Sequence, residues 1–74
     1  MSVTQKFYVE RAADARRAAE ASSLDNVRDR FLCAAAAWDV MAARHARTER
    51  MRVETDARKA AEREAAEIEA GVDA

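Results

Sequence analysis

Apolar residues recur every three or four positions along two stretches of the chain, and this spacing predicts two amphipathic helices. No stretch combines strand-like alternation with an excess of β-branched residues, so the pattern predicts an all-α fold. Both repeats advance by alternating steps of four and three, which is typical of helices that pack along one seam. The first repeat comprises Tyr8, Ala12, Ala15, Ala19 and Ser22, and the second comprises Val27, Phe31, Ala34, Trp38, Met41 and His45.

A short polar segment separates the two repeats. Residues 20–27 read EASSLDNV, and Ser22 precedes Asp25 by three positions, a near relative of the capping box that begins a helix. We therefore predict a first helix over about 3–21, a turn over about 22–24 and a second helix over about 25–70, ended by Gly71 as its C′ residue. Because short connections place helices antiparallel, residues 1–74 are predicted to form one helical domain, an antiparallel hairpin.

The two predicted helices differ greatly in length. At about 1.5 Å per residue the first spans about 28 Å and the second about 67 Å, so the first can cover the second only to about residue 45. Beyond that point a weaker apolar stripe continues through Val53, Ala57, Ala61, Ala65, Ile68 and Val72. The remainder of the second helix is either solvated or pairs with a second copy, which would complete the hairpin into a bundle.

Alanine accounts for 20 of the 74 residues, so large apolar side chains are few. The predicted hairpin core or interface contains five of them: Phe7, Tyr8, Phe31, Trp38 and Met41. A turn near residue 23 places Trp38 opposite Tyr8, and we predict that the tryptophan anchors the hairpin there. The alanines around it allow the two helices to approach closely.

Charge is distributed unevenly along a chain whose formal net charge is −1. Residues 44–52 are basic and contain four arginines, whereas residues 53–74 are acidic. One interpretation of Arg44, Arg47, Arg50 and Arg52 is a contact surface for an anion or a nucleic acid. The other is a solvated face, or ion pairs with the acidic tail of a second copy, which favours an antiparallel homodimer.

Catalytic and metal-binding signatures are sparse. Cys33 and His45 lie 12 residues apart on one predicted helix, about 18 Å by helical rise, and so cannot form a nucleophile–base pair within one chain. A single glycine excludes a glycine-rich phosphate loop. We therefore predict no enzyme activity, catalytic residue, metal site, cofactor or small-molecule ligand.

The sequence also indicates a location. No apolar stretch is long enough to span a bilayer, and the N-terminus lacks the apolar core of a secretory signal. A lone cysteine fits a reducing compartment, so we predict a cytoplasmic protein without a membrane partner.

An aromatic residue, an Arg- and Ala-rich helix, a short polar turn and a second helix with arginines and a tryptophan follow one another along residues 7–50. The residues of this pattern are Tyr8, Arg11, Ala12, Ala19, the turn 22–26, Arg28, Arg30, Leu32, Trp38 and Met41. With them the chain resembles a group of short alphaproteobacterial helical-hairpin proteins that are rich in Ala, Arg and Glu, carry a central tryptophan and have no assigned activity. The resemblance implies a helical hairpin and nothing catalytic. It does not extend over the tail.

These observations together predict a small non-catalytic interaction or structural protein that self-associates or docks on a larger protein. An apolar patch left exposed on a small hairpin, including Leu32 and Val40, supports this prediction. The alternative is a small nucleic-acid-associated regulator that uses residues 44–52.

Overall fold

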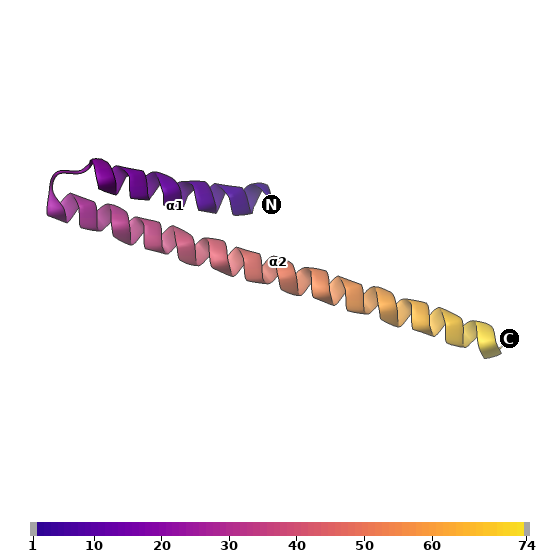
Figure 1. Cartoon of the computed structure of the whole chain (residues 1–74). Coiled ribbons are helices and arrows are strands. Elements are labelled where there is room, and N and C mark those ends of the chain that lie inside the picture. Colours follow the sequence, from indigo (N-terminus) through magenta and orange to yellow (C-terminus); the bar gives the residue numbers. More distant parts are fainter. Residues whose placement is uncertain (1, 74) are drawn as a thin grey trace.

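The computed structural model describes residues 2–73, which form two helices, α1 (Val3–Ala21) and α2 (Asp25–Asp73). The helices lie antiparallel and side by side, joined by a short turn, and α2 continues far beyond the N-terminal end of α1 (Figure 1). The molecule measures 75 × 16 × 10 Å, so its length is that of α2 and its thickness is that of one helix. The predicted all-α hairpin with a long second helix is confirmed.

Serines set both ends of α1. The Ser2 side chain accepts a hydrogen bond from the Gln5 amide at 3.1 Å, which satisfies one of the free N–H groups of the first turn. At the other end the Ser22 amide donates to the Ala19 carbonyl at 3.1 Å, and its hydroxyl donates to the Ala18 carbonyl at 2.8 Å. The prediction that Ser22 takes part in a capping box for the second helix is therefore wrong, because its hydrogen bonds close the first, but the second helix does begin at Asp25 as predicted.

The C-terminal end of α2 also differs from the prediction. The helix continues through Gly71 to Asp73. No described glycine has a positive φ angle, and a left-handed glycine is what a C′ cap requires. Glycine lowers helix propensity by about 1 kcal/mol relative to alanine but does not forbid a helix, so the preceding Ala/Glu run carries the helix past it.

Alanines form the contact between the helices. The buried residues are Ala12, Ala15 and Ala19 on α1 and Ala35 and Ala42 on α2, and among the described residues no large side chain is fully buried. Small side chains on both helices allow the backbones to approach closely. The hairpin core is therefore a ladder of methyl groups, with the larger residues along its edges.

The contact line on α2 is rotated from the predicted seam. It runs through Ala35, Trp38, Ala42 and His45, whereas the prediction placed Phe31, Ala34 and Met41 on it. Phe31 and Met41 are 36% and 39% exposed. Because alanines at 35 and 42 bring α1 closest to that line, Met41, one position earlier and turned by about 100°, lies at the edge of the contact.

An aromatic cluster lies between the helices near the open end of the hairpin. Trp38 contacts Phe7 edge-on at 5.7 Å between ring centroids and lies 6.0 Å from Tyr8. Phe7 also packs edge-on against Tyr8 at 5.9 Å, and the Arg11 guanidinium lies 5.8 Å from the Phe7 ring centroid. The prediction that Trp38 lies opposite Tyr8 is confirmed.

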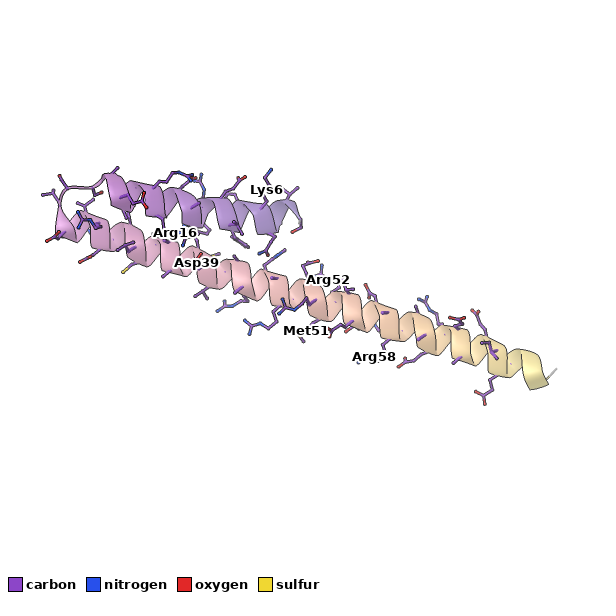
Figure 2. The ribbon with its side chains drawn as sticks, in the orientation of Figure 1. Lys6, Arg16, Asp39, Met51, Arg52 and Arg58 are labelled. Carbon is purple, nitrogen blue, oxygen red and sulfur yellow. The ribbon has the colours of Figure 1, made fainter. Side chains whose placement is uncertain are left out.

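One ion pair joins the two helices along their exposed side. The Arg16 guanidinium donates to the Asp39 carboxylate at 2.9 Å, and Figure 2 shows the two side chains turned toward each other from α1 and α2. The other α1 ion pairs, such as Arg11–Asp14, stay within the helix. Because both partners are about half exposed, the bridge adds little free energy but helps to fix the axial register.

Enlarging one of the buried alanines tests the close approach of the helices. Ala12 is fully buried, so Ala12→Leu must push α1 away from α2, and we expect it to destabilise the hairpin by about 1–3 kcal/mol. Urea unfolding followed by Trp38 fluorescence measures the change. Ala36→Leu, on the exposed side of α2, is the matched control and should shift the midpoint little. Equal shifts for both variants would contradict the buried alanine contact.

Trp38→Ala tests the aromatic anchor. Removing a fully buried tryptophan ring would lower the free energy of unfolding by about 3–5 kcal/mol. Because the Trp38 ring is only half-buried, we expect a decrease of about 2–3 kcal/mol. Amide hydrogen exchange should show loss of protection in α1, while Trp38→Phe, which keeps an aromatic ring against Phe7, should retain most of it. Unchanged protection of α1 in Trp38→Ala would show that the tryptophan does not hold the hairpin together.

Candidate interaction surfaces

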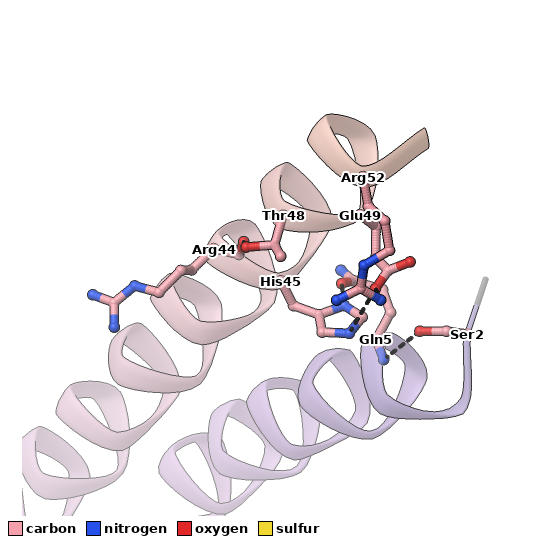
Figure 3. Close-up of polar contacts among 7 residues, drawn as sticks. All are labelled: Ser2, Gln5, Arg44, His45, Thr48, Glu49 and Arg52. Atoms are coloured by element: carbon pink, nitrogen blue, oxygen red, sulfur yellow. Dashed lines mark hydrogen bonds and ion pairs between the residues drawn. The ribbon is translucent and has the colours of Figure 1, made fainter. Parts of the chain in front are cut away.

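A polar network closes the open end of the hairpin, where α1 begins beside the middle of α2 (Figure 3). His45 Nδ1 donates to the side-chain carbonyl of Gln5 at 2.8 Å, and His45 Nε2 lies 3.8 Å from the Glu49 carboxylate. Arg52 donates to the same carboxylate at 3.1 Å. The His45 ring packs edge-on against Tyr8 at 6.0 Å, so the network adjoins the aromatic cluster.

A shallow groove on this end of the molecule combines aromatic, apolar and basic residues. Tyr8 and Met41 contribute to its lining, next to Arg44, Thr48 and Arg52. Thr48 donates back to the Arg44 carbonyl at 3.0 Å, so its hydroxyl serves the helix. Residues 44–52 contain no Phe, Tyr or Trp, but antiparallel packing brings Tyr8 from α1 into the same groove.

The four predicted arginines do not form one patch. Arg44, Arg47 and Arg50 are exposed and follow one another at three-residue steps, each turned by about 60° around α2. Arg52 pairs with Glu49, whereas Arg44 projects away from that pair in Figure 3. The arginines therefore form a belt around α2 just beyond the aromatic cluster.

The sequence did not single out Gln5 and Glu49 as members of the network. Both are half-buried polar residues, because α1 ends its coverage of α2 at this position. The hairpin geometry gave only a coarse signal: a turn that sets Trp38 opposite Tyr8 sets Gln5 opposite about residue 41, one turn short of His45, and the two side chains span that offset. Glu49 then follows His45 by four residues and lies on the same side of the helix.

Beyond Glu49, α2 has no packed neighbour within the described chain. Nearly every residue of this extension, which we define as residues 50–71, is exposed; Val53 and Ile68 are 65% and 62% exposed. Figure 2 shows Met51 and Arg58 on this part of α2, beyond the end of α1. Arg58 lies 3.9 Å from Glu62, an ion pair within the helix. The extension is thus a single helix with exposed apolar residues and charges of both signs.

Cys33 and His45 stay apart, as their spacing requires. The Cys33 thiol is exposed on α2, while His45 faces α1. No group of three or more His, Cys, Asp or Glu side chains that could hold a metal ion occurs within residues 2–73. In that same range, neither helix is long and apolar enough to cross a membrane.

A double-mutant cycle tests whether Gln5 and His45 couple the ends of the two helices. Each of Gln5→Ala and His45→Ala removes one partner of the hydrogen bond, and we expect a coupling free energy of about 0.5–1.5 kcal/mol. Urea unfolding monitored by Trp38 fluorescence provides the four free energies. Lys6 and Glu10, an exposed pair within α1, form the control cycle and should couple by no more than about 0.5 kcal/mol. A coupling of zero between Gln5 and His45 would show that the contact does not hold in solution.

Comparisons with protein-family models, curated proteins and solved structures return no match. The resemblance of residues 7–50 to short alphaproteobacterial hairpin proteins stays a prediction. The functional proposal therefore rests on the fold, the exposed apolar residues and the distribution of charge.

Proposed function

We propose that the chain is a small non-catalytic interaction protein whose α2 extension is the binding element, and that a second copy of the chain is the favoured partner. The observation that carries the proposal is the exposed apolar stripe on a helix that continues, unsupported, for some twenty residues beyond the end of α1. A larger protein that packs on the same stripe is the other partner we consider.

The physics of isolated helices supports a partner for the extension. A single helix in water gains little from its own hydrogen bonds, and most helical stability in proteins comes from packing an amphipathic face. Here the face exists, with Val53 and Ile68 at its ends, but α1 is too short to reach it. A second helix on this face would bury those side chains and stabilise the extension.

A non-catalytic role is supported by the placement of the reactive groups. The Cys33 thiol lies on an exposed side of α2, about 18 Å by helical rise from His45, and His45 is engaged by Gln5. Carboxylates such as Asp14 and Glu49 lie in ion pairs with arginines at the surface. An exposed thiol suits a reducing compartment, so we propose a cytoplasmic location.

A second candidate function is nucleic-acid binding at the arginine belt, with Tyr8 in the same groove as a stacking surface. Two observations disfavour it: Arg52 is engaged by Glu49, and the remaining arginines point in different directions around α2. Binding of this kind would weaken steeply with salt. Failure to retard DNA or RNA at about 50 mM salt would exclude it.

Sedimentation velocity of the full chain at micromolar concentrations tests the proposed function. We expect a species of twice the 8.2 kDa of one chain, in equilibrium with the monomer. Val53→Glu with Ile68→Glu places charges on the stripe and should shift the equilibrium to the monomer. Val9→Glu on α1 with Met51→Glu, on a different side of α2 from the stripe, is the matched control and should leave it unchanged. A fully helical monomer that also captures no protein from host extract would contradict the proposal.

A further inference from the structure

The exposed part of α2 is divided into three charge blocks. The basic block, residues 44–52, carries four arginines and one glutamate. The neutral block, residues 53–63, carries three acidic and three basic residues. The acidic block, residues 64–71, contains only negative charges, on Glu64, Glu67 and Glu69. The blocks therefore carry net charges of +3, 0 and −3, and the neutral block is centred at residue 58.

Most charged side chains of the basic and acidic blocks form no ion pair within the described chain. Among the residues that the structure describes, Arg47 and Arg50 form no ion pair, and neither do Glu64, Glu67 and Glu69. The pair Arg58–Glu62, by contrast, lies within the neutral block. Glu54, Asp56, Lys59 and Arg63 of the neutral block also form no described ion pair, but their charges cancel. The net charge thus lies at the two ends of the exposed helix, positive at one and negative at the other.

A stripe of small and apolar residues crosses all three blocks. Taking about 100° per residue, its members fall within about 80° of one another around α2, and two charged residues, Arg50 and Glu64, fall in the same sector. Its centre is formed by Ala57 and Ala60, and Gly71 has open space where a Cβ would lie. Alanine and glycine permit another helix to approach closely. The stripe comprises five exposed residues, Val53, Ala57, Ala60, Ile68 and Gly71, and Ala46, which is half-buried beside Ser2 and Gln5.

We propose that two copies pack antiparallel along this stripe, with the two-fold axis near Ala57 and Ala60 and each basic block beside the acidic block of the other copy. The inference rests on the proposed function and names its partner, orientation and register. Arg50 then faces Glu67 of the second copy, and the arrangement repeats by symmetry. The two hairpins lie at opposite ends of the dimer.

Charge decides the orientation because the stripe itself does not. Alanines bury little apolar area, and a row of alanines packs almost equally well in parallel or antiparallel orientation. A parallel pair would set the two basic blocks side by side and the two acidic blocks side by side, which is unfavourable twice over. An antiparallel pair replaces both repulsions with attractions, and a dimer held this way weakens as salt rises.

Distances between spin labels test the orientation directly. In a Cys33→Ser background, labels on Thr55→Cys lie about 10 Å apart along the axis of the antiparallel dimer, and labels on Ala70→Cys about 35 Å apart. We therefore expect a short distance for the first variant and a long one for the second. Short distances for both would indicate a parallel dimer and overturn the inference, while self-association itself would stand.

Charge exchange tests the register. Arg47→Glu with Arg50→Glu should weaken dimerisation at least about tenfold, measured by sedimentation equilibrium, because each altered block then faces like charge. Adding Glu64→Arg and Glu67→Arg to the same chain should restore much of the lost affinity, since the two blocks then carry net charges of about −1 and +1 and attract each other again. Lys6→Glu with Arg30→Glu, both on exposed hairpin positions, alters the net charge equally and should leave dimerisation unchanged.

The outcomes separate this inference from the proposed function. A four-substitution chain that stays monomeric, when the native chain dimerises, would overturn the charge-block register. A native chain that is monomeric but binds another protein through its extension would overturn the inference and leave the proposed function standing. A monomer that binds nothing would overturn both.

Discussion

The close contact of alanine on alanine is the constraint on which the hairpin depends. Ala12, Ala15 and Ala19 on α1 and Ala35 and Ala42 on α2 are the buried residues of this contact, and no large described side chain is fully buried in it. The helices can therefore lie nearly backbone to backbone. This geometry contributes little hydrophobic free energy per residue, so the hairpin relies on the larger side chains at its edges for the rest of its stability.

The larger side chains lie near the open end of the hairpin, where they also fix the axial alignment of α1 along α2. A row of alanines would permit α1 to slide along α2, but Trp38 packs against both Phe7 and Tyr8, and His45 is hydrogen-bonded to Gln5. Arg16 and Asp39 add a third point of contact between the helices. Directional contacts with distinct partners thus specify the alignment that the uniform core leaves open.

Helix positions were predictable because serines and steps of three and four residues mark them in the sequence, and the turn location alone set Trp38 against Tyr8. The rotation of α2 was not predictable. Ala34 and Ala35 fit the contact equally well by residue type, so the choice between Met41 and Ala42 depended on how closely α1 approaches. The predictions for Gly71 and Ser22 failed for a related reason. Glycine is typical of the end of a helix and serine of its start, but only the three-dimensional structure shows which hydrogen bonds each residue makes.

The continuity of α2 has a mechanical consequence. A single helix of 49 residues acts as a spacer of fixed length and fixed phase, because it contains no proline and its one glycine lies at the far end. Inserting one residue near Met51 would lengthen it by only about 1.5 Å but rotate everything beyond by about 100° relative to the hairpin. Inserting seven residues would nearly restore the rotation of the distal part of α2 relative to the hairpin. Evolution could therefore change the length of α2 by heptads more readily than by single residues.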